Sequence, residues 1–136
     1  MKSFKLKIVT PRGIYYEGEV EIVNVRSIVG QLGILADYAP LTTVLEIDEM
    51  NFLEQGERKE FALSGGFLYV DETGATIAAN SIESKEEIDL ERAIKEKERV
   101  KKLLRKKVDQ IDLMKAEVTL RKSLLRISVK KGSDKY

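Results

Sequence analysis

The sequence lacks two residue types on which much protein chemistry depends, because none of its 136 residues is cysteine or histidine. This excludes disulfides, thiol chemistry, zinc sites built from these residues and every catalytic triad with a histidine base. No run approaches the ~20 apolar residues of a membrane span, and residues 1–7 lack the apolar core of a secretion signal. We therefore expect a cytoplasmic chain, where the lack of disulfides is usual.

The charge is unevenly distributed, although the net charge is only +1. Residues 1–80 contain seven basic and twelve acidic side chains, whereas residues 81–136 contain seventeen and eleven. A basic half beside an acidic half indicates contact with an acidic partner or with phosphates. The alternative is a solvated helical face without a ligand.

The glycine-rich segments do not predict catalysis. Ser64-Gly65-Gly66-Phe67 indicates a tight passage of the backbone, and Ser64 has no histidine to activate it. The sequence also lacks the Gly-x-x-x-x-Gly-Lys-Ser/Thr pattern whose backbone N–H groups bind phosphates. We expect no enzyme active site and no metal site in this chain.

Residues 1–83 have the pattern of short strands separated by turns. A strand over residues 5–9 ends at Pro11-Arg12-Gly13, the next covers residues 20–26, and a hairpin turns at Gln55-Gly56-Glu57-Arg58. Strands at about ten-residue spacing predict a β-sandwich or flattened barrel. The glycines around Leu32 predict a bend or bulge between short strands, in a loop from Val29 to Tyr38. Its apolar residues belong either to the core or to a docking patch.

Residues 84–136 are predicted to be helical. Ser84-Lys85-Glu86-Glu87 has the form of a capping box, and Asp109 and Asp112 fit the start of a second helix. One apolar stripe nevertheless continues through the break, formed by Val100, Leu104, Val108, Ile111, Met114 and Val118. Two arrangements therefore compete: an antiparallel helix pair, or one helix of about 40 residues and ~60 Å. Such near-degeneracy suits a conformational switch, whereas a rigid helical hairpin is the simpler alternative.

The helical half also contains a candidate anion or nucleotide site. Asp89 and Arg92 lie one turn apart, Arg99 lies two turns beyond, and Ala93 leaves room beside them. If the helices fold back on each other, Lys122 and Arg126 can face these arginines. Four cations around one cleft favour a bound triphosphate, since guanidinium groups bind phosphate oxygens bidentately. The alternative is that all four point to water.

Taken together, the chain resembles the epsilon subunits of bacterial F-type ATP synthases, and the resemblance covers nearly the whole sequence. It rests on motifs that occur in the family's order and spacing: Val9-Thr10-Pro11, Gly30-Gln31-Leu32-Gly33-Ile34-Leu35, Ala39-Pro40-Leu41, Ser64-Gly65-Gly66-Phe67 and Ile88-Asp89-Leu90-Glu91-Arg92-Ala93.

The resemblance implies an α+β chain in two parts. Residues 1–83 are expected to form a β-sandwich that docks on the rotor, and residues 84–136 a regulatory antiparallel helix pair. The implied partners are the gamma subunit, the c-ring and the alpha/beta catalytic head, which the helices inhibit when extended. The implied docking residues are Gly30, Gln31, Leu32, Gly33, Ile34, Leu35 and Tyr38. Here Gln31 replaces the family's usual glutamate, and Ala36-Asp37-Tyr38 replaces its common Pro-Gly-His.

Some members of the family bind ATP as a regulatory ligand through an Ile/Leu-Asp-x-x-Arg-Ala motif. Carried over position by position, the implied nucleotide-binding residues are Glu83, Ile88, Asp89, Arg92, Ala93, Arg99, Lys122 and Arg126. Lys122 stands where the family has an arginine, so the charge is kept and the planar fork is lost. Neither the resemblance nor the residues decide whether Mg²⁺ takes part.

We therefore expect a non-catalytic coupling and regulatory subunit of a proton-translocating synthase. The implied location is peripheral, at the cytoplasmic face of the bacterial plasma membrane, with membrane contact only through the complex. One rival is a free-standing ATP-binding switch, which would not copurify with a synthase. A nucleic-acid-binding module is a second rival, but few aromatic residues interleave with the basic ones, as single-strand binding would favour.

Overall fold

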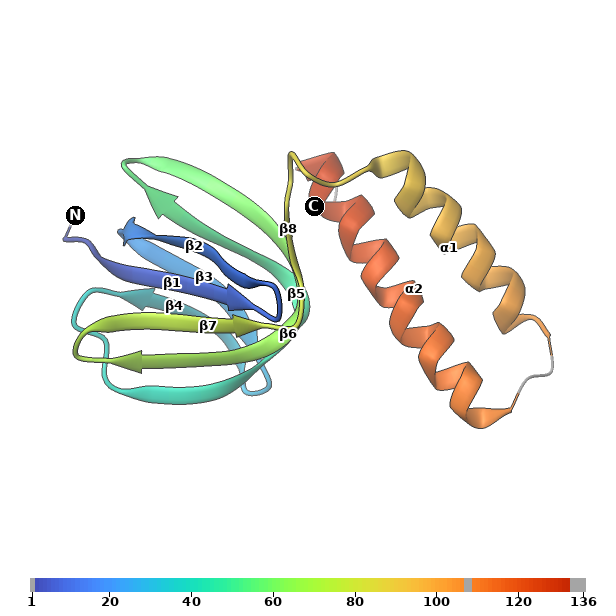
Figure 1. The fold of residues 1–136 in the computed structure, drawn as a ribbon, viewed down its shortest axis with the longest axis horizontal. Helices are drawn as coiled ribbons and strands as arrows, with labels where there is room; N and C mark the ends of the chain where they lie inside the picture. Colours follow the sequence, from blue (N-terminus) through green and yellow to red (C-terminus); the bar gives the residue numbers. More distant parts are fainter. Residues whose placement is uncertain (1, 107–108, 133–136) are drawn as a thin grey trace. The chain divides into compact units, whose positions relative to one another are not determined.

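The computed structural model describes residues 2–106 and 109–132, in two compact units, Met1–Ser84 and Lys85–Tyr136. Within the described residues, the first unit contains eight strands and the second contains two helices (Figure 1). This confirms the predicted fold class, a β-sandwich followed by an antiparallel helix pair. Val108 of the predicted apolar stripe lies outside the described residues. Across the described part of the chain, neither helix combines the length and apolar character needed to cross a membrane.

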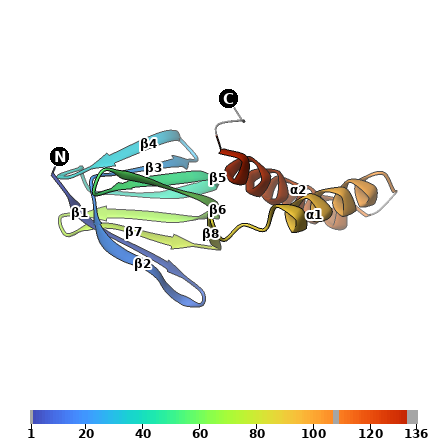
Figure 2. The same ribbon diagram turned by 90° about the horizontal axis from the view of Figure 1, so that it is seen from above.

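The strands form one hydrogen-bonded sheet that folds over itself. Its order is β2-β1-β7-β6-β5-β3-β4, with β8 paired to β6. In Figure 2, β3 and β4 lie on one side of the sandwich, and β1, β2 and β7 lie on the other. The bounds are β1 (Phe4–Thr10), β2 (Gly13–Val20), β3 (Ile22–Ser27), β4 (Gly30–Leu35), β5 (Leu41–Glu54), β6 (Glu57–Asp71), β7 (Gly74–Ala79) and β8 (Ile82–Ser84).

The core lies between the two sides of this sheet. Alternate residues of the strands point inward, as in β7, where Ala75, Ile77 and Ala79 are buried. Strand β2 closes the sandwich with two aromatic side chains. The ring of Tyr16 lies 4.7 Å from that of Phe52 in β5, centroid to centroid, and Tyr15 meets a phenylalanine of β6 edge-on. These ring contacts join the edge strand β2 to β5 and β6 across the core.

The sequence analysis missed one strand of this unit and made one wrong prediction. Residues 13–20 were not predicted as a strand, yet they form β2 at the sheet edge, paired with β1. Residues 30–35 were predicted to bend, yet they form the regular strand β4, paired with β3 from Ser27↔Gly30 to Ile22↔Leu35. Gly33 leaves room for the Asn24 side chain of the neighbouring strand, because a Cβ at this position would lie only 3.3 Å from Asn24 Oδ1.

The second unit consists of α1 (Leu90–Leu104) and α2 (Gln110–Lys131), which lie side by side in both views (Figures 1 and 2). Of the two predicted arrangements, the structure contains the antiparallel pair. Asp109 caps α2, accepting a hydrogen bond from the Asp112 backbone N–H at 3.0 Å, as predicted. Near the end of α2, Lys130 Nζ donates to the Lys85 carbonyl at 2.9 Å. This contact ties the end of α2 to the segment that precedes α1.

Candidate functional site

Helix α1 begins within the motif that the sequence analysis singled out. Asp89 is the N-cap, with extended backbone, and its carboxylate accepts a hydrogen bond from the Arg92 backbone N–H at 3.1 Å. The predicted capping box at Ser84 is wrong, because Ser84 ends β8 and pairs with Phe61 of β6. A strand residue cannot also serve as the cap of a helix that starts six residues later. The acidic residue next to the helix takes that role.

The predicted nucleotide-binding residues are distributed over both units. Glu83 belongs to the first unit, where it is half-buried in β8 and pairs with Ala62. The other seven belong to the second unit. Ile88 and Ala93 are buried, and their apolar side chains offer no polar contact. Among residues 2–106 and 109–132, no group of three or more carboxylates is placed to hold a metal ion.

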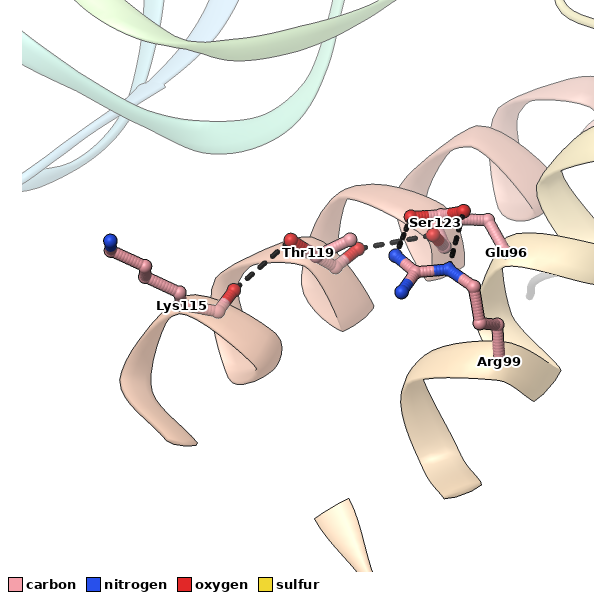
Figure 3. Close-up of polar contacts among 5 residues, drawn as sticks. All are labelled: Glu96, Arg99, Lys115, Thr119 and Ser123. Atoms are coloured by element: carbon pink, nitrogen blue, oxygen red, sulfur yellow. Dashed lines mark hydrogen bonds and ion pairs between the residues drawn. The ribbon is translucent and has the colours of Figure 1, made fainter. Parts of the chain in front are cut away.

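The predicted arginines all act on the charge of one residue that the sequence analysis did not name. Glu96 lies on α1, four residues after Arg92 and three before Arg99. It accepts hydrogen bonds from Arg99 Nη2 at 2.6 Å and from Nε at 3.2 Å (Figure 3). These bonds hold the pKa of the Glu96 carboxyl below its usual range. The positive charges of Arg126 and Arg92 lower this pKa further, so both lie within electrostatic reach of the carboxylate.

The exposure of the four predicted cations differs between the helices. Arg92 and Arg99 are exposed on α1, whereas Lys122 and Arg126 are half-buried on α2. The charges that lower the pKa of Glu96 come from Arg99, Arg126 and Arg92. The i, i+3 and i, i+4 spacings of a glutamate between two arginines are the sequence signal that was missed.

The seam between the helices is narrow and contains small residues. Each helix has two buried residues, Ala93 and Val100 on α1 and Ser123 and Val129 on α2. The Ser123 hydroxyl donates to the Thr119 carbonyl at 3.0 Å, within α2 (Figure 3). A groove of about 290 Å³ lies between the helices, and Arg99 and Thr119 are among its lining residues. Few residues of either helix are therefore fully buried, and the other apolar side chains of the pair are partly or well exposed.

The predicted apolar stripe is divided by this packing. Val100 is buried in the seam, but Ile111 and Met114 at the start of α2 are 67% and 61% exposed. Val118 is 38% exposed on the same side of the helix. In the helix pair, half of the stripe thus has no packing role.

The predicted docking residues do not form one surface. Ile34 is fully buried in the core, and Leu32 packs partly against it. Gly30 and Gln31 lie at the β3–β4 turn, at one end of β4, Gly33 lies in the middle of the strand, and Leu35 and Tyr38 lie at or beyond its other end. At that end Leu35 and Tyr38, 45% and 36% exposed, line a hollow of about 630 Å³. The first and last residues of β4 are five positions apart, which separates the two ends by about 17 Å.

A second set of apolar residues crosses the outer face of the sandwich. It is a row of residues that are neighbours in the sheet register, from β2 through β1, β7, β6 and β5 to the β3–β4 turn. Ile28 joins it through its backbone N–H, which donates to the Val44 carbonyl at 3.1 Å. We call this set the outer row; its members are Ile14, Val9, Ala78, Phe67, Val44 and Ile28.

Four members of the outer row are well exposed. Ile14 and Ile28 are 59% and 60% exposed, and Phe67 and Val44 are 46% and 39% exposed. Phe67 also stacks on Tyr69, with ring centroids 6.4 Å apart on the same face. A contiguous apolar face of this kind marks an interaction site. The sequence offered one sign of this surface, which is the occurrence of consecutive apolar residues in a strand, as in Phe67-Leu68. Successive side chains point to opposite faces of a sheet, so only one of the two can face the core.

Comparison with known proteins gives the same family over both units. Residues 3–85 match the beta-sandwich domain of the ATP synthase, Delta/Epsilon chain, family, and residues 86–131 match its long alpha-helix domain. The ATP synthase epsilon chain of Caldanaerobacter subterraneus subsp. tengcongensis is 39% identical, over 94% of each chain. That of Bacillus licheniformis is 36% identical, over 95% of this chain and 98% of its own.

Two solved structures have a similar fold at lower identity. A chain of the Euglena gracilis mitochondrial ATP synthase, OSCP/F1/c-ring, has a TM-score of 0.76 at 22% identity, over 88% of this chain and 76% of its own. A chain of the central stalk/c-ring of the Tetrahymena thermophila enzyme has a TM-score of 0.65 at 16% identity, over 96% of each chain.

Proposed function

The chain belongs to the ATP synthase delta/epsilon chain family, and we propose on that basis that it couples and regulates the rotor of a bacterial F-type ATP synthase. The family's sandwich and helices are both present, in order, which supports a role that needs both. In this proposal the chain is not catalytic and acts in the central stalk. It is peripheral to the cytoplasmic face of the membrane and reaches the membrane only through the complex.

The observation that carries the coupling role is the outer row. Six neighbouring apolar positions, of which Ile14 and Ile28 are the most exposed, would lose contact with water when a partner covers them. The row ends at the β3–β4 turn, next to Gly30 and Gln31 of the predicted docking set. We infer that the row and this turn form one surface, which docks on the gamma subunit and the c-ring.

The docking proposal is tested by copurification of the chain with its own gamma subunit and catalytic head. Phe67→Glu places a charge in the middle of the row and should abolish the complex, since the charge would have to be buried. Leu124→Glu on α2 is the matched control, because Leu124 is 45% exposed and Phe67 is 46% exposed. A complex that survives Phe67→Glu would contradict this docking surface. A chain that never copurifies with the synthase would favour the free-standing switch.

The regulatory role is supported by the weakly packed helix pair. Only two residues of each helix are buried, while Ile111 and Met114 present apolar side chains to water. An extended arrangement that covers these side chains with a partner gains about 1.5–3 kcal/mol for each one buried. We propose that the extended helices contact the alpha/beta catalytic head and inhibit ATP hydrolysis. When the helices fold back into the helix pair, they leave the head and the inhibition ends.

The ligand proposed to stabilise the helix pair is ATP. Glu96 on α1 binds Arg99, and the charges of Arg92 on α1 and Arg126 on α2 lower the pKa of the same carboxyl. A polyphosphate bound by arginines from both helices would hold the helices together, because it binds the pair and not the extended form. Asp89 and Lys122, which belong to the same unit, complete the proposed contacts.

The ATP proposal is tested by calorimetric titration of the full chain with ATP, with and without Mg²⁺. Arg126→Ala should remove binding, because it removes the contribution of α2 to the arginine group. Lys122→Arg, which restores the family's planar fork, should strengthen binding. Failure of the unmodified chain to bind ATP at millimolar concentration, together with unchanged hydrogen exchange of α1 and α2, would contradict the proposal.

A further inference from the structure

Glu96 binds one of the arginines, Arg99, that the proposed function assigns to phosphate binding. Its two carboxylate oxygens take the Nε and Nη2 edge of Arg99, at 3.2 and 2.6 Å. A guanidinium edge forms two parallel hydrogen bonds with one carboxylate or one phosphate. A phosphate oxygen therefore cannot use this edge of Arg99 while Glu96 holds it.

The contact between these two side chains is local and accessible. Glu96 precedes Arg99 by three residues, so the pair forms wherever α1 is helical. The side chains are 33% and 57% exposed, and a pair so exposed is weak. A ligand with several phosphate groups that also meets Arg92 and Arg126 can displace the single carboxylate.

We propose that Glu96 is an internal competitor of the phosphate ligand, which holds Arg99 in the unliganded helix pair and leaves it when a polyphosphate binds. This inference rests on the proposed nucleotide site and adds its regulation. Glu96 weakens the binding of every phosphate ligand, both by occupying Arg99 and by repelling the negative charge. It does not weaken the binding of an uncharged nucleoside.

The test is calorimetric titration of the full chain and its Glu96→Gln variant with ATP, inorganic tripolyphosphate and adenosine. Glutamine keeps the shape of the side chain and removes its charge. We expect Glu96→Gln to bind ATP and tripolyphosphate roughly five- to tenfold more tightly, from the removal of one competing pair and one like charge. The matched control is Glu117→Gln, an exposed glutamate of α2, which should leave the affinity nearly unchanged. The heat of binding of adenosine should not differ between the variants.

A second readout follows Arg99 itself. The Nε–H signal of Arg99 in ¹⁵N NMR should shift when ATP is added to the unmodified chain. In the Glu96→Gln variant without ATP, this signal should have a different chemical shift, because Arg99 no longer pairs with a carboxylate. Circular dichroism of both proteins confirms that α1 is folded, so that a loss of helix is not mistaken for a loss of competition.

The outcomes separate this inference from the proposed function. ATP binding that is equal or weaker in Glu96→Gln, with the unmodified chain binding ATP, would overturn the role of Glu96 and leave the nucleotide site intact. Binding by Glu96→Gln alone would support the role strongly. Binding by neither protein would overturn both the role of Glu96 and the proposed nucleotide site.

Discussion

The carboxylate of Asp89 accepts a hydrogen bond from the backbone N–H of Arg92 at 3.1 Å, so a residue of the predicted nucleotide motif is also the N-cap of α1. The motif thus determines where α1 begins as well as where a ligand is proposed to bind. A loss of ATP binding after removal of this side chain has two possible causes, a frayed helix or a lost ligand contact.

The first prediction separates these two causes. Asp89→Ala should lower the free energy of unfolding of the helix pair by about 1 kcal/mol, the usual cost of a lost N-cap. Asp89→Ser keeps an oxygen that can accept the same hydrogen bond and should be nearly as stable as the unmodified chain. Urea unfolding followed by circular dichroism at the helical bands measures both. Equal destabilisation by the two variants would show that Asp89 does not act as a cap.

The second prediction concerns the pH dependence of the sandwich. The hydroxyl of Tyr16 donates a hydrogen bond to Glu54, which holds the pKa of the Glu54 carboxyl below its usual range, with help from Lys59. A carboxyl with a lowered pKa in the folded state stabilises the fold above its ordinary pKa of 4.5. This stabilisation decreases as the pH falls below that value and is gone once the pH lies below the lowered pKa of the folded state.

Tyr16→Phe isolates this contact, because it removes the hydroxyl and keeps the ring that packs on Phe52. At neutral pH the variant should be about 1 kcal/mol less stable. The difference in stability from the unmodified chain should shrink as the pH falls below 4.5. The reason is that the hydrogen bond from Tyr16 favours the charged form of Glu54, which is lost on protonation. Urea unfolding at several pH values measures it. A difference that stays constant with pH would contradict the assigned role of the carboxylate.

The third prediction concerns the backbone at Gly66. Its φ is +144°, and a Cβ there would lie 2.1 Å from the Ala78 carbonyl oxygen of β7. Gly66→Ala should therefore cost at least about 3 kcal/mol, because strands β6 and β7 would have to separate. Gly56→Ala is the control, as its φ of +78° is unfavourable but its surroundings are open. It should cost about 1 kcal/mol in thermal unfolding. Similar losses in both variants would argue against the close approach of β6 to β7.

The fourth prediction follows the helices directly. The sequence contains no cysteine, so spin labels can be placed at Glu91 and Leu124 alone, both of which are exposed. In one continuous helix these positions would be about 50 Å apart, whereas in the helix pair they lie far closer. ATP should move the distance distribution measured by pulsed electron resonance towards the short distance. Arg126→Ala should remove the response, and an unchanged distribution in the unmodified chain would contradict ATP as the switch.

The sequence predicted the hairpins that have distinctive turns. Gln55 and Gly56 both have positive φ, 52° and 78°, a conformation that favours glycine and joins two strands by a two-residue loop. Strand β2 was missed because it lies at the edge of the sheet. It contributes the half-buried rings of Tyr15 and Tyr16 rather than an aliphatic alternation. Strand β4 was mistaken for a bend because its two glycines were interpreted as residues that allow the backbone to turn.

The candidate site was predicted in part. The recognition of the family from short motifs is confirmed by the comparisons, and the convergence of Arg92, Arg99 and Arg126 was expected if the helices fold back. Glu96 was missed because a glutamate in a charged helix resembles solvated surface until its neighbours are known. The capping of α1 was assigned to Ser84 because sequence spacing cannot show that this residue ends a strand.

The most direct test of the account is ATP hydrolysis by the cognate catalytic head with its gamma subunit, measured with and without this chain at low and high ATP. The account predicts that the chain slows hydrolysis at low ATP and does so much less at high ATP. It also predicts that Arg126→Ala inhibits at both concentrations, since ATP can no longer hold the helix pair. Hydrolysis that the chain leaves unchanged, or inhibits equally at every ATP concentration, would contradict the proposed regulation.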